Sequence, residues 1–585
     1  MRVFLYLMWF FKQEKKAYVT GILLLLLVAF LQLVPPRLIG VVVDAINNET
    51  LTSADLIKWM TLLLSSAVGM YVLRYIWRVM IFGSAVKLGR QLRERLYKHF
   101  TQMAPQFYQN RRVGDLMAHA TNDLSAVQQT AGAGVLTLVD SLATGLFVIA
   151  AMAITIDVKL TLIALIPMPF MAILTNYYGT LLHKRFGVAQ EAFSDLNDKT
   201  QESISGVKVL KTFGQEKEDI ESFSSLSKEV VDKNIAVARV DSLFDPTIAL
   251  VVGASFFLSI FYGGQMVVAD ELTIGQLISF TTYLGLLIWP MLAFGWLFNI
   301  VERGRASYER VEALLNQDID IKDKPNAIAA PPKGEILVEI DDFTFPGSST
   351  PSLKEVHFTL NRGETLGIVG RTGAGKTTIL KLLMREFEGY EGKIMIDSIS
   401  IDEYSKSALR SSIGYVPQDH FLFSASIKEN IAFTNPALSQ SEINRAASLA
   451  HVHEDILGFS SGYDTVVGER GVSLSGGQKQ RISIARALIM NPEILLLDDS
   501  LSAVDAKTEE AILSSLKETR NGKTTIITSH RLSAVQHADL IIVLDEGMLV
   551  ESGSHEVLMK QKGWYYAMYM RQQLEDLVEQ GGHAE

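Results

Sequence analysis

Long runs of apolar residues, each about twenty positions in length, dominate the first 300 residues of the chain. A helix needs roughly 20 apolar residues to cross a bilayer. The first run is also too long for the apolar core of a secretory signal, so we predict that it stays in the protein as a membrane span. The pattern predicts six membrane-spanning helices, at residues 17–40, 56–82, 134–155, 159–181, 247–268 and 277–299.

Basic residues between these runs predict the side of the membrane on which each connection lies, because loops rich in lysine and arginine stay in the cytoplasm. Lys12, Lys15 and Lys16 precede the first span and predict a cytoplasmic N-terminus. The two long basic connections, 83–133 and 183–246, are likewise predicted inside. Both have a largely helical pattern, so we expect the helices to extend well beyond the bilayer.

Beyond residue 335 the pattern changes to short apolar strands that alternate with amphipathic helices. Such alternation predicts a sheet covered by helices. The stretch before it is polar and contains prolines, as linkers do. We therefore predict a membrane α-helical bundle at 1–315, a linker at 316–334, an α/β domain at 335–575 and a flexible tail at 576–585.

The composition narrows the possible partners and chemistry. The 585 residues carry a net charge of −10, so charge gives no reason to expect nucleic-acid binding. The sequence has no cysteine, which excludes disulfides, thiolate metal sites and cysteine nucleophiles. A lipid bilayer is the partner that the apolar first half requires.

A glycine-rich loop in the second half carries the first candidate chemistry. It lies between a predicted strand, 365–369, and a predicted helix, 377–387. Glycines let backbone N–H groups close around a phosphate, and a helix N-terminus adds partial positive charge. Lysine and threonine at the end of such a loop suit the terminal phosphates and Mg²⁺. The residues of this predicted phosphate site are Gly370, Arg371, Thr372, Gly373, Ala374, Gly375, Lys376, Thr377 and Thr378.

Two carboxylates end another predicted strand, 494–499. Asp498 suits a bound Mg²⁺, and Asp499 stands where an ATP hydrolysis site is expected to carry a glutamate base. Aspartate is one methylene shorter, which retracts the carboxylate by roughly 1.5 Å. A base must come within about 2.6–3.2 Å of its proton, and a misplacement of about 1 Å can slow a reaction about 10²-fold. We expect good ATP binding and poor hydrolysis, unless the backbone shifts to compensate or the pair serves only a metal.

Further motifs follow in the order found in ABC transporter ATPases, and the second half resembles that family. Phe345 stands where the family usually has an adenine-stacking tyrosine, and phenylalanine keeps the ring face. Residues 468–471 resemble a contact segment of the family's exporters. The other matching residues are Gln418 of the Q-loop, Ser475, Gly476, Gly477 and Gln478 of the signature loop, Asp505 of the D-loop and His530 of the switch loop.

This resemblance implies ATP and Mg²⁺ as cofactors and gives each motif a role. The implied catalytic residues are Asp499, His530 and Gln418. The implied Mg²⁺ ligands are Thr377, Gln418 and Asp498. Phe345 and the phosphate loop would bind this chain's own ATP, whereas residues 475–478 would act on the site of a second subunit.

Six spans followed by one ATPase domain is the plan of half-transporters among type IV ABC exporters. Residues 497–505 are particularly similar to one subunit of heterodimeric bacterial multidrug exporters, the MdlA- and BmrC-like group. In that family each nucleotide site joins one subunit's phosphate loop to the other's signature loop. A homodimer would contain Asp499 twice, so the resemblance implies a partner half-transporter with a glutamate base. The implied function is export of hydrophobic or amphipathic compounds across the cell membrane by alternating access.

Two other functions stay open at this point: a homodimeric lipid flippase in which Asp499 works adequately, and an ATP-sensing regulatory subunit that does not transport. The spans also hold residues that could face a substrate cavity, although such residues more often pack against neighbouring helices or lipid. They are the polar Gln32, Asp140 and Asn176, and in the sixth span Trp289, Met291, Phe294, Trp296 and Phe298.

Overall fold

The computed structural model describes residues 2–109, 111–468 and 472–581, and it divides into two compact units. The first unit comprises Met1–Gln102 and Arg111–Asp318, and the second comprises Met103–Asn110 and Ile319–Glu585. The division falls inside the stretch predicted as a linker and adds a short segment from the first half to the second unit. Residues 469–471 and the side chains of Asn176 and Phe294 lie outside the described part.

The first unit is helical throughout, and six of its stretches are long and apolar enough to cross a membrane: Lys15–Asn47, Ser53–Gln102, Val113–Thr155, Val158–Ser205, Glu216–Val268 and Ile274–Leu315. Each contains one predicted span, so the prediction of six spans is confirmed. The described helices of this unit are α1 Arg2–Tyr6, α2 Met8–Gln13, α3 Lys15–Leu31, α4 Val34–Asn47, α5 Ser53–Gln102, α7 Val113–Ala118, η1 His119–Asp123, α8 Leu124–Gln129, η2 Thr130–Gly134, α9 Val135–Thr155, α10 Val158–Leu165, α11 Met168–Ser205, α12 Val207–Phe213, α13 Glu216–Asp241, α14 Phe244–Val268, α15 Ile274–Leu286 and α16 Ile288–Leu315.

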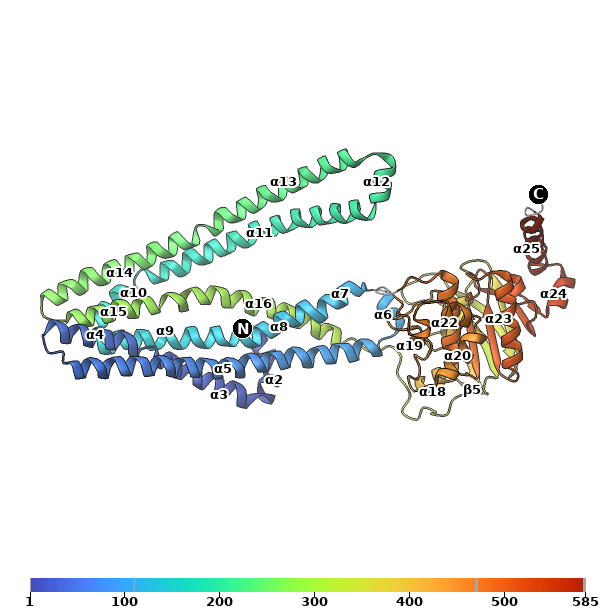
Figure 1. The fold of residues 1–585 in the computed structure, drawn as a ribbon, viewed down its shortest axis with the longest axis horizontal. Coiled ribbons are helices and arrows are strands. Elements are labelled where there is room, and N and C mark those ends of the chain that lie inside the picture. The colour runs from blue at the N-terminus through green and yellow to red at the C-terminus, as the bar shows by residue number, and fades with distance from the viewer. Residues whose placement is uncertain (1, 110, 469–471, 582–585) are drawn as a thin grey trace. The chain divides into compact units, whose positions relative to one another are not determined.

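Several of these helices are longer than a bilayer is thick. Helix α5 has 50 residues, which is about 75 Å at 1.5 Å per residue, against about 30 Å for a hydrocarbon core. Helices α11 and α13 form a two-helix arm with α12 at its tip, and this arm diverges from the other helices of the unit (Figure 1). The expectation of helices that extend beyond the bilayer therefore agrees with the structure.

Helix α16 lies close against the segment that joins α7 to α9. That segment contains two short π-helical turns, η1 and η2. In η1 the buried Asp123 accepts hydrogen bonds from Ser307 Oγ at 2.8 Å and from Arg310 Nε at 3.0 Å. In η2 the Thr130 hydroxyl donates to the carbonyl of Ile300 at 3.0 Å. These polar contacts fix the extension of the third span to that of the sixth.

Replacing Gly304 by alanine tests this packing, because a Cβ there would lie 1.8 Å from Thr130 Oγ1. The two helices would have to separate, so we expect Gly304→Ala to cost about 1–3 kcal/mol and to lower the Tm of the purified protein. Gly295→Ala, on the same helix, is the matched control, since no atom lies within 4 Å of an added Cβ. Equal Tm values for the two variants would contradict the close contact.

A ten-stranded sheet organises the second unit, in the order β5-β4-β1-β2-β10-β9-β3-β8-β7-β6. Strands β6, β7, β8, β3 and β9 pair in parallel, whereas β1, β2, β4 and β5 pair antiparallel. The strands are β1 Ile336–Phe343, β2 Leu353–Leu360, β3 Thr365–Gly370, β4 Glu391–Ile396, β5 Ile399–Ser400, β6 Ile413–Val416, β7 Ile494–Asp498, β8 Thr524–Thr528, β9 Leu540–Asp545 and β10 Met548–Gly553. The parallel part confirms the predicted α/β domain.

The sequence of strand β7 is apolar at every position before Asp498, because both faces of the strand are covered. All five of its residues are buried. Leu495 and Leu497 belong to the core on one face of the sheet, and Ile494 and Leu496 to the core on the other. A parallel strand covered on both faces needs apolar side chains at successive positions.

The register of the parallel strands brings three chain segments together. Thr528, at the end of β8, pairs with Ile368 of β3 on one side and with Asp498 of β7 on the other. The carboxyl ends of β3, β7 and β8 therefore meet at one edge of the sheet. Loops that leave this edge are the usual place for a ligand site in such folds.

Two predictions for the ends of helices in the second unit are wrong. The helix after the glycine loop was expected to reach 387 but ends at Leu383, because Arg385 adopts a left-handed backbone (φ 54°). The last helix continues to Gly581, into the predicted tail. The helices are α6 Pro105–Gln109, α17 Lys376–Leu383, α18 Lys406–Ser411, α19 Ile427–Ile431, α20 Gln440–Leu449, α21 His453–Leu457, η3 Gly462–Asp464, α22 Gly476–Leu488, α23 Ala506–Thr519, η4 Leu532–Ala534, α24 His555–Gln561 and α25 Trp564–Gly581.

Candidate nucleotide site

The glycine loop connects the end of β3 to the start of α17, as the sequence predicts. Gly370, Gly373 and Gly375 all have positive φ angles (149°, 83° and 97°). A Cβ on Gly370 would lie 2.1 Å from the carbonyl oxygen of Leu544, and one on Gly375 would lie 2.6 Å from Leu353 Cδ2. Glycine is therefore required at both positions, and it leaves a backbone cradle at a helix N-terminus that suits an anion.

Lys376 is almost completely buried and reaches back along this loop. Its Nζ donates to the carbonyl oxygens of Gly370 at 2.9 Å and Arg371 at 3.0 Å. Burial lowers the pKa of Lys376, while the nearby carboxylates of Asp499 and Asp498 act in the opposite direction. The structure thus places the loop lysine near Asp498, the last residue of β7, and near Asp499, which follows it.

Asp498 is held by three hydroxyl groups from three different elements. Its Oδ1 accepts from Thr377 Oγ1 at 2.9 Å and from Thr528 Oγ1 at 2.8 Å. Its Oδ2 accepts from the Tyr415 hydroxyl at 3.3 Å. Burial and the Asp498 carboxylate raise the pKa of Tyr415, so this hydroxyl keeps its proton. The carboxylate is fixed at the start of the phosphate loop helix.

These residues fit a magnesium ion that is shared with a nucleotide. Among the described residues, no three His, Cys, Asp or Glu side chains gather into a metal site. Mg²⁺ commonly uses only one or two protein oxygens, completed by phosphates and water. Thr377 Oγ1 and Asp498 Oδ1, 2.9 Å apart, could supply those oxygens beside the phosphate cradle.

Asp499 has a left-handed backbone conformation (φ 44°), which aspartate tolerates better than most residues. Its backbone N–H donates to both the carbonyl oxygen and the hydroxyl of Thr528, each at 3.0 Å. The carboxylate is half-buried, and its charge acts on Lys376, His420 and His530. The candidate base therefore lies near the Lys376 cation of the phosphate loop and near two histidine side chains, His420 and His530.

Two histidines accompany this carboxylate. Partial burial and the Lys376 cation lower the pKa of His530, and Asp499 opposes them. The His530 side chain is exposed at the end of β8. His420 was not singled out from the sequence; burial lowers its pKa, and its Nδ1 is enclosed without a hydrogen-bond partner in the described part of the chain. Gln418, two residues earlier, is exposed after β6.

The remaining predicted ATP contacts are Phe345 and the other residues of the loop and of its helix. Phe345 is half-buried and packs edge to face on Phe343 and Phe387, with ring centroids 5.0 Å apart in both pairs. Ala374 and Thr378 are buried. Arg371, Thr372 and Gly373 are exposed.

The signature residues stand apart from this site. Ser475 caps α22 by accepting a hydrogen bond from the Gln478 N–H, and the Gln478 side chain accepts from the Ser475 N–H in return. Ser475 and Gly476 are exposed, while Gly477 is half-buried. In the described ranges, no hydrogen bond joins residues 475–478 to the phosphate loop. The N-terminus of this helix is thus capped by its own residues, Ser475 and Gln478.

Two residues that support Asp498 had no role assigned from the sequence: Tyr415 and Thr528. Both belong to segments that the sequence did single out, just before Gln418 and just before His530. Their hydroxyls reach Asp498 only because β6, β7 and β8 are neighbours in the sheet. Strand order is not visible in a single sequence, so these contacts could not be anticipated.

Comparison with known proteins gives the class of this molecule. Residues 18–291 match the ABC transporter transmembrane region, and residues 353–502 match the ABC transporter family. A solved structure of a bacterial Atm1-family ABC exporter with ATP bound is similar, with a TM-score of 0.78 and 27% identity over 95% of this chain and 98% of that one. The fold and the site define an ABC exporter half-transporter with an ATPase domain coupled to transport.

The chain belongs to the ABC transporter family. It is 47% identical to the multidrug resistance-like ATP-binding protein MdlA of Escherichia coli (strain K12), over 98% of this chain and 97% of that protein. MdlA of Buchnera aphidicola subsp. Schizaphis graminum is also 47% identical, over 99% and 100%. The probable multidrug resistance ABC transporter ATP-binding/permease protein YheI of Bacillus subtilis is 46% identical, over 98% of both chains.

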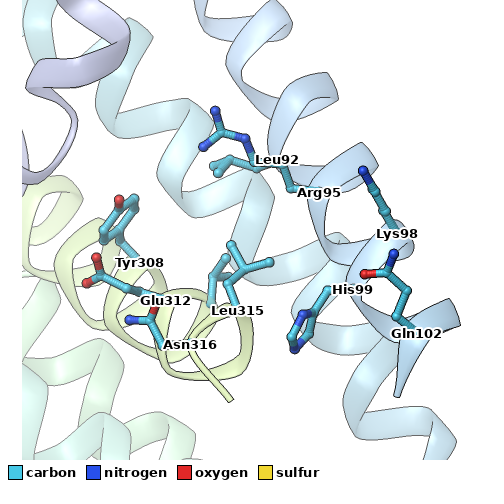
Figure 2. A pocket seen from close by; sticks show the side chains of 10 residues that line it. Leu92, Arg95, Lys98, His99, Gln102, Tyr308, Glu312, Leu315 and Asn316 are labelled. Atoms are coloured by element: carbon cyan, nitrogen blue, oxygen red, sulfur yellow. The ribbon is translucent and has the colours of Figure 1, made fainter. Parts of the chain in front are cut away.

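A separate hollow of about 400 Å³ lies in the first unit, between α5 and α16 (Figure 2). His99 contributes to its wall, and the Nε2 of this side chain is buried without a hydrogen-bond partner in the described residues. The hollow contains none of the predicted nucleotide residues and none of the span-six aromatics. Its lining consists of Leu92, Arg95, Lys98, His99, Gln102, Tyr308, Val311, Glu312, Leu315 and Asn316.

Replacing Thr528 by valine tests the support of Asp498. The substitution keeps the volume and removes a hydroxyl worth about 1–3 kcal/mol to a buried charged partner. We expect ATP affinity measured with Mg²⁺ to fall about tenfold, with little change when Mg²⁺ is chelated. Thr525→Val, on the same strand and bonded to Arg520 instead, is the control. Equal effects with and without Mg²⁺ would contradict the assignment.

Proposed function

We propose that this chain is one subunit of a heterodimeric ATP-driven exporter, and that its own nucleotide site holds ATP and hydrolyses it slowly. The observation that carries the proposal is the aspartate at position 499. A compensating shift of the backbone would have to break the two hydrogen bonds that its N–H donates to Thr528. The shorter side chain therefore stays roughly 1.5 Å short of a glutamate's reach.

Each group of the site has a task in this proposal. Bound Mg²⁺ would offset negative charge on the phosphates. Asp499 would face the attacking water without reaching it, so ATP stays intact and keeps two ATPase domains together. The other roles are adenine stacking by Phe345, phosphate binding by residues 370–378 with Lys376, Mg²⁺ binding by Thr377, Asp498 and Gln418, and contact with the terminal phosphate by His530.

The signature loop is the part that would act on the partner. Its exposed, capped helix N-terminus can bind an anion, and no hydrogen bond between described residues joins it to the phosphate loop of its own chain. In a head-to-tail pair it would complete a site built on the partner's phosphate loop. Because that site must supply the turnover, we propose that the partner carries glutamate at the position equivalent to Asp499.

The arm of the first unit also supports a second subunit. Apolar side chains near its tip are exposed: Phe213 by 72%, Ile204 by 70% and Val209 by 60%. Soluble surfaces rarely expose such a group of large apolar residues unless another protein covers it. We propose that the partner half-transporter covers the tip of the arm.

The proposed cargo is hydrophobic or amphipathic compounds, since similar proteins carry multidrug resistance in their names. Trp289, Trp296 and Phe298 of α16 have side chains 54–60% exposed within the apolar sixth span, where they could meet such compounds. The proposed location is the cell membrane, with the N-terminus and the ATPase domain in the cytoplasm, from the placement of basic loops.

Substituting the two candidate bases one at a time separates their contributions to ATP turnover. In the assembled transporter we expect the partner's Glu→Gln substitution to lower the ATPase rate about 10²-fold or more. Asp499→Asn should leave the rate within about a factor of two, because the site that it alters contributes little. Both variants must still bind ATP, measured by nucleotide titration.

The opposite pattern, in which Asp499→Asn abolishes turnover and the partner's substitution does not, would overturn the proposal. The assembly for this experiment is whatever co-purifies with the tagged chain. Recovery of this polypeptide alone would favour the homodimeric lipid flippase.

A further inference from the structure

The last helix of the second unit, α25, packs one face onto the domain core. Tyr565 is fully buried, and Met568 and Tyr569 contact the same apolar cluster. Residues three, four and seven positions apart share one face of a helix, so the next position on this face is Gln572. An uncharged amide therefore continues an apolar stripe, at the point where α25 reaches the segment that carries His530.

Gln572 makes two hydrogen bonds to that segment. Its Nε2 donates to the carbonyl oxygen of His530 at 2.8 Å, and its Oε1 accepts from the backbone N–H of Leu532 at 2.9 Å. The two bonds need an amide in one orientation, because a rotated amide would set oxygen against oxygen and N–H against N–H. Gln572 thus bonds to the residues on both sides of Arg531. These bonds hold the backbone of residues 530–532, the switch segment, in place.

The same segment is anchored on its other side. Arg531 Nη1 donates to the Val504 carbonyl at 3.2 Å and to Glu509 Oε2 at 3.0 Å. Glu509 is almost completely buried, and its Oε1 also accepts from Ser533 Oγ at 3.1 Å. The backbone around His530 is therefore held between α23, which follows the D-loop, and α25. Gln572 supplies the α25 side of this support.

The His530 imidazole itself is exposed and lies within the electrostatic reach of Lys376 and Asp499. The backbone fixes the point from which this side chain extends, and the carbonyl of His530 is bonded to Gln572. A change of about 1 Å in such a group can alter its effect on a ligand severalfold or more. The support that Gln572 gives to the backbone would therefore affect the proposed contact of His530 with the phosphate.

We infer that Gln572 is a positioning residue, which directs His530 toward the terminal phosphate of ATP bound at Lys376 and so sets how long this site retains ATP. The inference rests on the proposed role of His530 in the chain's own site. It makes the C-terminal helix a part of the nucleotide site, although α25 contributes no group that touches the nucleotide.

The test measures how long ATP stays on this chain in the full transporter. The protein is loaded with Mg²⁺ and radiolabelled 8-azido-ATP, chased with unlabelled ATP, and photolabelled at intervals. We expect Gln572→Ala to shorten the retention time about three- to tenfold, the effect of losing one or two hydrogen bonds. His530→Ala should shorten it at least as much.

The neighbouring Gln573 gives a matched control, since its Nε2 donates to the Tyr569 hydroxyl at 3.0 Å and not to the switch segment. Gln573→Ala should keep the wild-type retention time. If Gln572→Ala does not fold, Gln572→Met keeps the length and packing of the side chain and removes both hydrogen bonds.

The double variant His530→Ala/Gln572→Ala decides whether the glutamine acts through the histidine. We expect it to match His530→Ala alone, because contacts that work through one group are not additive. Additive losses, an unchanged Gln572→Ala, or an equal loss in Gln573→Ala would overturn the inference. If His530→Ala itself leaves retention unchanged, the proposed role of His530 fails, and this inference fails with it.

Discussion

The buried carboxylate of Asp498 ties together parts of the ATPase domain that lie far apart in the sequence. It accepts hydrogen bonds from Thr377, 121 residues earlier, and from Thr528, 30 residues later. Burying this carboxylate would be costly without such donors, and they are available because the apolar strands β3, β8 and β7 align in parallel register. These contacts hold the phosphate loop, strand β7 and the end of β8 together.

The position of Asp499 follows from the same arrangement. Its backbone N–H is bonded to Thr528, which also supports Asp498, so a shift of the candidate base would disturb the contacts of the Asp498 carboxylate. With the backbone held in this way, the Asp499 carboxylate stays closer to the backbone than a glutamate carboxylate would. The signature loop, residues 475–478, is capped and partly exposed, and in the described part of the chain no hydrogen bond joins it to the phosphate loop. Together these features support the proposal that the chain works as one half of a pair, binding ATP at its own site and completing the site of its partner.

Much of this could be predicted from the sequence, because the decisive signals were local. The six apolar runs marked the spans, and the strand, glycine loop and helix around Lys376 appeared as expected, with the helix ending four residues early at Leu383. Contacts between segments could not be predicted. The bond from Tyr415 to Asp498 depends on strand order, and those from Gln572 to the switch segment depend on where α25 folds back. The sequence of the π-helical turns η1 and η2 does not distinguish them from ordinary α-helix.

The central claim is that Asp499 leaves this chain able to hold ATP and unable to consume it at a useful rate. The most direct measurement is the ATPase rate of the purified full-length chain, without any partner, at a concentration of ATP shown by direct binding to fill its site. The account predicts saturated binding with a rate close to background. Rapid, sustained hydrolysis by the chain alone, abolished by Asp499→Asn, would contradict it.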